Sequence, residues 1–335
     1  MLYVSTRNNT DTFTAYSALH EDRAPDGGYF VPQRLQVLSE TEIAEFTNMT
    51  FGERIARVLN LFFPVGLNGW DVEFTVGRHP CKLVTMSSRL YIAELWHNLQ
   101  SNFSFWEQAL YTKLCDREVK AASPTGWAKI AIRIAALFGI YGEIVKEDTK
   151  TVDFANTLGD CGFIAAAVYA QKMGLPIGKV ICSGDENSCV WDLFRKGEIA
   201  LVTTRPEENL QYLELLLYEV FGIDAVECYL RAKETESVFQ LNREQMMLFT
   251  KTFDSTVISS SRCSALIRSI YRTYNYISVP QVAVTYGGLQ DYRAKTGESR
   301  PTLLILDISP KAFVKLISEA TGLTPDEIRK HSSNS

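Results

Sequence analysis

A loop that joins an extended segment to a helix holds the first candidate for chemistry. It reads Gly159-Asp160-Cys161-Gly162 and is followed by three alanines, 165–167. Backbone N–H groups at a helix N-terminus attract anions, so this loop could hold a phosphate. Asp160 counts against a phosphate, because a desolvated carboxylate in the cradle would repel the bound charge. We therefore favour a turn in which the glycines bend the chain and the alanines let the helix pack closely.

A thiol and a histidine are the other groups that could react. The dipole of the expected helix would favour a Cys161 thiolate, but the neighbouring carboxylate opposes this, and no histidine is placed as its base. We therefore expect a structural thiol. His97 follows Trp96 and fits a packed, hydrogen-bonded side chain better than a catalyst. The four histidines and seven cysteines show no zinc-ligand spacing, so the sequence predicts no metal site.

Alternating strands and helices must position these groups. Helices are expected near 126–146, 186–196, 207–221, 242–251, 261–274, 279–297 and 310–320, and strands at 179–183 and 302–307. A strand pair or hairpin is expected over 82–96. Ser39 with Glu42, and Thr50 with Glu53, have the spacing of helix capping boxes. This alternation predicts an α/β fold with a mainly parallel sheet.

Composition argues against several classes of protein. The 335 residues carry a net charge of −5, which does not suit binding to a nucleic-acid backbone. There is no apolar run of 18 or more residues and no apolar leader, so neither a membrane span nor export is expected. An odd number of cysteines without a C-x-x-C pair fits reduced thiols and a cytoplasmic protein.

Several motifs, in one order along the chain, resemble the threonine synthase family. They include "APDGGYFVP" (24–32), "IAELWH" (92–97), "TGWAKIAIRI" (125–134), "GDCGFIAAAVYAQKMGLPIGKVICSGDEN" (159–187) and "LLILDISPKAF" (303–313). The resemblance implies a pyridoxal phosphate (PLP) enzyme fold of the tryptophan-synthase β type, fold type II. It also implies the family reaction, in which O-phosphohomoserine and water give threonine and phosphate.

The resemblance also suggests how the chain is divided. We expect a threonine synthase-like region at 1–100, an α/β core at 101–325 and a flexible tail at 326–335. In the family, about a hundred residues, the size of a small domain, separate the cofactor-lysine helix from the next conserved helix. Here only the stretch near 116–125 joins the two, so one cofactor subdomain is expected to be largely deleted.

Such a deletion would affect the surface of the remaining core. If it uncovers apolar side chains such as Trp127, Ile130 and Leu137, their exposure would favour self-association into a homo-oligomer.

The residues that the resemblance would assign to the cofactor are changed. Aligned without a gap, Ser104 falls on the family's cofactor lysine, whereas His97 keeps the histidine of that motif. Asp160 and Cys161 replace the asparagine and phenylalanine of the phosphate loop, and Asp307 falls on a threonine near the pyridine nitrogen. PLP chemistry needs an amine that forms a Schiff base, which a serine hydroxyl cannot supply. The cofactor-like pocket is expected at His97, Ser104, Gly159, Asp160, Cys161, Gly162 and Asp307.

Ser104 has a second interpretation that needs no cofactor. With Glu107 it fits S-x-x-E, a capping box that contributes on the order of 1 kcal/mol to a helix. Lys113 lies nine residues further on. On a helix it would point to the opposite face, about 13 Å along the axis, and so could not replace the amine. Lys82 and Lys129 stay open as replacement amines.

Three functions follow from this pattern. The favoured one is a threonine synthase-like protein that has lost PLP catalysis, holds no cofactor and acts by binding an amino-acid-like ligand or a protein partner. The second is an active PLP-dependent lyase with relocated catalytic residues. The third is a different enzyme built around His97, Asp160 and Cys161.

Overall fold

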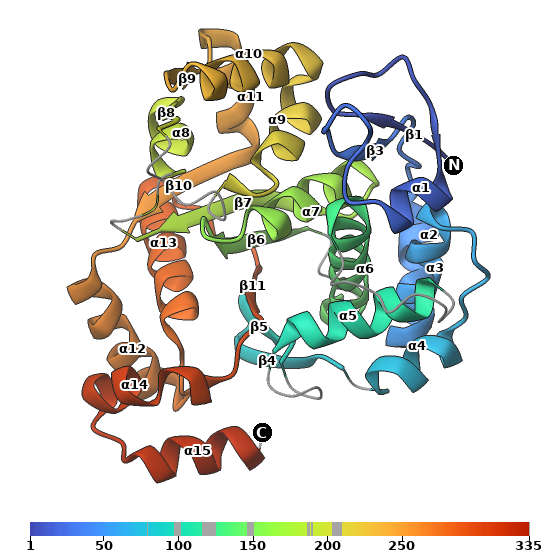
Figure 1. Cartoon of the computed structure of the whole chain (residues 1–335). Coiled ribbons are helices and arrows are strands. Elements are labelled where there is room, and N and C mark those ends of the chain that lie inside the picture. The colour runs from blue at the N-terminus through green and yellow to red at the C-terminus, as the bar shows by residue number, and fades with distance from the viewer. Residues whose placement is uncertain are drawn as a thin grey trace.

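A six-stranded sheet runs through the molecule (Figure 1). The computed structural model describes residues 1–78, 80–96, 102–115, 125–145, 151–185, 188, 190–202 and 210–334. The strands of this sheet are β4 (Lys82–Ser87), β5 (Leu90–Glu94), β6 (Val152–Thr157), β7 (Ile177–Gly184), β10 (Phe253–Val257) and β11 (Thr302–Leu306). They lie in the order β10-β7-β6-β11-β5-β4, and only the β4–β5 pair is antiparallel. The predicted mainly parallel sheet and the strand pair at 82–96 are confirmed.

The central strands are buried because helices cover both faces of the sheet. All five residues of β11 are buried, as expected for a parallel strand packed on two sides. Successive side chains alternate between two apolar clusters: Phe154 and Cys182 belong to one, Ala155 and Ile181 to the other. The first face carries α3 (Phe51–Phe62), α5 (Phe103–Leu114), α6 (Gly126–Ile144) and α7 (Cys161–Lys172), and the second carries α12 (Ser260–Tyr274) and α13 (Pro280–Thr296).

Smaller elements surround this framework. The N-terminal region contains β1 (Leu2–Ser5), β2 (Phe13–Thr14), α1 (Ala15–His20), β3 (Phe30–Pro32), α2 (Glu40–Glu45), η1 (Phe46–Asn48) and α4 (Gly69–Val76). After β7 come α8 (Trp191–Lys196), β8 (Glu198–Ala200), α9 (Leu213–Phe221), α10 (Ile223–Glu234), β9 (Val238–Gln240) and α11 (Arg243–Thr252). The chain ends with η3 (Pro310–Phe313), α14 (Val314–Thr321) and α15 (Pro325–Asn334). The first apolar cluster runs from Tyr3 to Ile305, so the N-terminal region shares its core with the rest.

The helix α6 is surrounded by protein. It packs against α3, α5 and α7. Trp127 and Ile130 are fully buried and Leu137 is 1% exposed. The expectation that these residues line an uncovered face is therefore wrong, because a helix that is apolar on all sides lies inside the core. The linker near 116–125, whose shortness predicted the deletion, lies mostly outside the described residues.

The predicted helices α6, α11, α12 and α13 are confirmed within two residues at each end. The segment 310–320 divides into η3 and α14, and the stretch expected to fray is helical instead, as α15. Thr324 caps α15 by accepting from the Glu327 N–H at 3.3 Å, while Glu327 accepts from the Thr324 N–H at 2.7 Å. Ile328 is fully buried and anchors α15 to the second apolar cluster.

At Gly288, α13 lies very close to β7. A Cβ atom built there would lie 1.9 Å from Ser183 Oγ and 3.0 Å from Thr256 Cγ2. Such overlaps force neighbouring groups to move, which costs more than the gain in helix propensity when alanine replaces glycine. The close approach of α13 therefore depends on the missing side chain.

We expect Gly288→Ala to destabilise the protein by about 1–3 kcal/mol, because the new methyl group displaces Ser183. Urea unfolding of the variant and the wild type measures the difference. A Gly288→Ala variant that is as stable as the wild type would show that α13 can withdraw from the sheet at little cost.

Candidate functional site

The helix α5 begins beside the carboxyl end of β11. Asn102 is its N-cap, and Asn102 Oδ1 accepts from the Ser104 N–H at 2.9 Å. The Phe103 N–H donates to the Asp307 carbonyl oxygen at 2.9 Å, and Asn102 pairs with Ile308 in a β-bridge. The fold thus brings the segment holding Ser104 next to Asp307, as the family resemblance implied.

Ser104 does not cap this helix, so the capping-box prediction is wrong. It lies inside α5 with its side chain exposed, and Asn102 provides the cap. Asparagine is among the strongest N-cap residues, which explains why the helix begins earlier than S-x-x-E suggested. Glu107 is buried and contacts Arg133 instead of reaching back to the cap.

Arg133 on α6 is the centre of a buried ion cluster. Its Nε donates to Glu107 Oε1 at 2.6 Å, and its Nη1 donates to Asp160 Oδ1 at 2.5 Å. The guanidinium also lies 4.6 Å from the centre of the Phe163 ring, and Lys129 Nζ lies 3.9 Å from Glu107 Oε2. Burial alone would lower the pKa of Arg133, but the two carboxylates raise it above its ordinary value. The arginine is therefore fixed as a cation.

Asp160 occupies the helix N-terminus that could have held a phosphate. As the N-cap of α7, its Oδ1 accepts from the Gly162 N–H at 3.1 Å and the Phe163 N–H at 3.3 Å. Gly162 leaves room for Arg133, since a Cβ atom there would lie 2.3 Å from Arg133 Nη1. Two backbone donors at this helix start are thus bonded to the chain's own carboxylate.

Asp307 faces the same cluster. Burial raises the pKa of Asp307 to about 6, and the negative charge of Asp160 adds to the rise, while Arg133 and a hydrogen bond with Gln281 counteract it. This acid therefore titrates closer to neutrality than an ordinary aspartate.

Of the other predicted pocket residues, Cys161 is buried and its Sγ lies 3.8 Å from the Leu158 carbonyl oxygen. Gly159 lines a cavity of about 330 Å³ beside the cluster. His97 lies outside the described residues.

The cavity beside the cluster opens at the carboxyl ends of β6 and β7, the edge where open α/β sheets bind ligands. Ser183 Oγ in its wall is fully buried and has no hydrogen-bond partner among the described residues. The described lining of this cavity contains no lysine or arginine. It consists of Thr157, Leu158, Gly159, Ser183, Gly184, Asp185, Ser188, Val190, Pro280, Gln281 and Val284.

The sequence analysis gave Glu107 a capping role in place of its bond with Arg133, and it missed Arg133 and Gln281 as site residues. A signal existed for one of them, because Arg133 is the sole charged residue in the apolar stretch 130–142.

Within the part of the chain that is described, no group of three or more His, Cys, Asp or Glu side chains could hold a metal ion. The helices of that part include none long and apolar enough to cross a membrane.

Comparisons with known proteins find similarity to threonine synthases. The family model described as "Threonine synthase N terminus" matches residues 2–72. "Threonine synthase-like 1" of Homo sapiens is 26% identical over 182 residues, which are 50% of this chain and 24% of that protein. The threonine synthase of Methylobacillus glycogenes is 24% identical over 226 residues, covering 64% of this chain and 47% of that protein. The chain thus matches between about a quarter and a half of the length of these curated relatives.

Solved structures show the same fold. The PLP-bound threonine synthase from Brucella melitensis superposes with a TM-score of 0.80 at 18% identity, covering 97% of this chain and 92% of that one. The yeast threonine synthase gives a TM-score of 0.80 at 17% identity, covering 99% of this chain and 94% of that one. The chain therefore has the fold of the type II PLP enzymes, as predicted. In sequence, residues 2–72 match the N-terminal family model of threonine synthases, and the chain is similar to threonine synthases and threonine synthase-like proteins.

We expect Asn102→Ala to lower the free energy of unfolding by about 1 kcal/mol, since the cap of α5 is lost. Ser104→Ala should change it by less than about 0.5 kcal/mol, because an exposed side chain is removed without its backbone N–H. Denaturant unfolding compares the two variants. A larger loss of stability for Ser104→Ala than for Asn102→Ala would show that Ser104 is the cap.

We expect Asp307→Asn to stabilise the protein above pH 6 by roughly 1–3 kcal/mol, because a raised pKa marks a carboxylate that is costly in the folded state. The folded pKa is about 6 and the ordinary value is 3.8. The wild type therefore loses stability as the pH rises between these values, and the advantage of the variant should vanish below the lower one. Thermal unfolding across this range measures the effect; a pH-independent difference contradicts it.

Proposed function

We propose that this threonine synthase-like chain does not carry out PLP catalysis and acts by binding. The observation that supports this most strongly is the Asp160 carboxylate, which accepts two backbone N–H bonds at the start of α7. In a functioning phosphate cradle such donors would face the ligand. Here an anion would have to displace a carboxylate that is also paired with Arg133.

The charges around the cradle also oppose a phosphate. Glu107 and Asp160 place two carboxylates against the single guanidinium of Arg133. The arginine is thus already matched, and it offers no excess positive charge to a further anion. A phosphate brought next to Asp160 in this partly desolvated place would meet strong repulsion.

The three lysines considered as replacement amines do not lie at an open anion site. Lys113 Nζ lies 2.7 Å from Asp71 Oδ1, and Lys82 Nζ lies 3.8 Å from Glu94 Oε2. Lys129 is closest to the cluster, but it lies by Glu107 and next to the filled cradle. Of these three lysines, Lys129 is therefore the one on which an active PLP enzyme would depend.

The cavity beside the cluster supports a binding role. Its described wall offers hydroxyl groups, the amide of Gln281 and the unpartnered Ser183 Oγ. A volume of about 330 Å³ suits a ligand the size of an amino acid. We infer an uncharged or zwitterionic small molecule as the occupant, in a cytoplasmic protein. A protein partner or a second copy of the chain is the alternative.

The buried environment of Cys161 does not favour a different enzyme there. Its thiol lies against a backbone carbonyl below the start of α7. A nucleophilic cysteine needs access to substrate and a thiolate-stabilising neighbour. The adjacent Asp160 carboxylate carries a negative charge, which would destabilise a thiolate.

Mixing the protein with PLP tests this proposal. We expect no yellow Schiff-base absorbance and no borohydride-fixed adduct at one molecule per chain, with the PLP-bound threonine synthase from Brucella melitensis as the positive control. Peptide mass mapping after reduction separates scattered labelling of surface lysines from a single site.

Two lysine variants sharpen the result. Lys129→Arg keeps the charge near Glu107 and removes the amine that is paired with this cluster, whereas Lys113→Arg is the matched control on α5. A stoichiometric adduct that Lys129→Arg abolishes and Lys113→Arg preserves would establish the active PLP alternative. Growth of a threonine-requiring strain carrying the wild-type chain would have the same meaning.

A further inference from the structure

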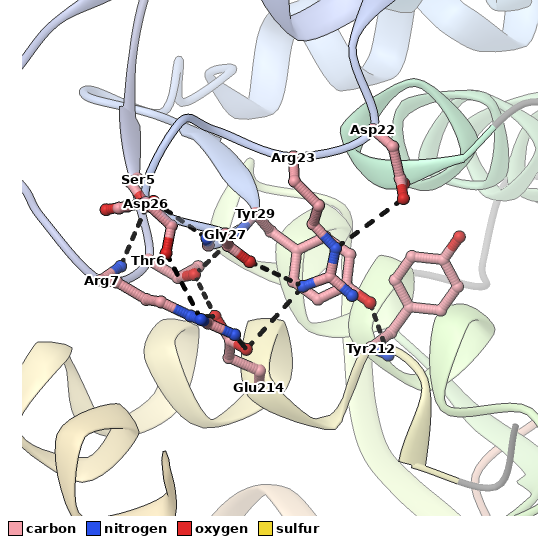
Figure 2. Close-up of polar contacts among 11 residues, drawn as sticks. Ser5, Thr6, Arg7, Asp22, Arg23, Asp26, Gly27, Tyr29, Tyr212 and Glu214 are labelled. Carbon is pink, nitrogen blue, oxygen red and sulfur yellow. Dashed lines mark hydrogen bonds and ion pairs between the residues drawn. The ribbon is translucent and has the colours of Figure 1, made fainter. Parts of the chain in front are cut away.

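The N-terminal motifs build a second pocket, apart from the cofactor-like site. Figure 2 shows Arg7 and Arg23 converging on Glu214 of α9, with Tyr29 beneath Arg23. The pocket has a volume of about 290 Å³ and lies between the N-terminal region and the helices α9 and α10. It shares no residue with the cluster around Arg133, so its role is independent of the proposed function.

Glu214 fixes the geometry of this pocket. It is 5% exposed and accepts from Arg7 Nε at 3.1 Å, Arg7 Nη2 at 2.9 Å and Thr6 Oγ1 at 2.6 Å. Two parallel bonds between a guanidinium and a carboxylate hold both groups in one plane. Arg7 is therefore rigidly placed with one edge toward Glu214.

Arg23 is held by different contacts. Its guanidinium carbon lies 3.4 Å from the centre of the Tyr29 ring, and its Nη1 donates to the Gly27 carbonyl oxygen at 3.3 Å. Its Nη1 is also 3.8 Å from Glu214 Oε2. Stacking on an aromatic ring orients a guanidinium without using its N–H groups.

Some N–H donors of Arg7 and Arg23 take no part in the hydrogen bonds described above. A guanidinium has five N–H groups. The hydrogen bonds of Arg7 use Nε, Nη2 and Nη1, the last at 3.4 Å from the Asp26 carbonyl oxygen, while that of Arg23 uses Nη1 alone. One carboxylate thus serves two guanidinium groups, and most donors of Arg23 have no hydrogen-bond partner in the described part of the chain.

The charge of the described pocket wall is positive. Arg7, Arg23 and Lys233 line it together with a single carboxylate, that of Glu214. Asp22 and Asp26 lie nearby and weaken the field, but neither lines the cavity. Asp26 Oδ1 is moreover engaged by Ser5 Oγ at 2.7 Å and the Gly28 N–H at 2.9 Å.

We propose that this pocket binds a small oxyanion, a carboxylate or phosphate group, between Arg23, Lys233 and the remaining N–H groups of Arg7. Guanidinium groups match the oxygens of such groups in pairs. Tyr29 and Tyr229 form part of the wall and can contact the body of the ligand. Neutralising Glu214 does not require Arg23, because the two hydrogen bonds from Arg7 and the one from Thr6 already satisfy that carboxylate.

Calorimetric titration at low ionic strength tests the site, with inorganic phosphate and succinate as separate probes. We expect one saturable site per chain for at least one of them. Lys233→Gln should weaken that binding roughly tenfold, since one charged contact is lost. Lys315→Gln on α14, an exposed lysine in a distant part of the chain, is the control with the same charge change.

Arg23→Gln tests the same site from its other wall and should also weaken binding about tenfold. Because Arg23 packs on Tyr29, the unfolding midpoint of the Arg23→Gln variant is measured together with its binding. If that variant is unstable, the test depends on Lys233→Gln, because Lys233 is exposed. The relative affinities for the two probes identify phosphate or carboxylate as the preferred group. No saturable binding of either anion, or equal binding by Lys233→Gln and Lys315→Gln, overturns the proposal.

Discussion

The bond between Arg133 and Asp160 connects the parts of the central site. It ties α6 to the start of α7, and through Glu107 it also reaches α5. A buried ion of this kind is tolerated only when its charge is matched and its hydrogen bonds are made. Removing either carboxylate would leave Arg133 poorly compensated, so the cluster resists change in a place where a cofactor enzyme would need an accessible anion site.

Much of the architecture was readable from apolar periodicity and from glycine and proline positions. The parallel sheet, α6 and α13 followed from these patterns. The helix α10 was missed, although Gly222 with a φ of 84° marks its boundary with α9. The helical C-terminus was missed because polar composition suggested fraying, whereas one buried side chain, Ile328, holds it in place.

The site was predictable in its chemistry and not in its contacts. The sequence showed an acid in the candidate cradle at Asp160 and an alcohol at the position of the family's lysine. It could not show that Asp160 would pair with Arg133, because the two are far apart along the chain and meet only through the packing of α6 on α7. The choice of Asn102 over Ser104 as the cap depended likewise on the bridge to Ile308, a long-range contact.

The shared core has a consequence for any attempt to divide the chain. The segment from β1 to α4 contributes Tyr3, Phe62 and the rest of α3 to the packing around α6. A fragment that starts after this segment would expose the Trp127 indole and its aliphatic neighbours to water, and such surfaces promote aggregation. Dissection of this protein into independently folding pieces therefore has no natural cut on the N-terminal side of α6.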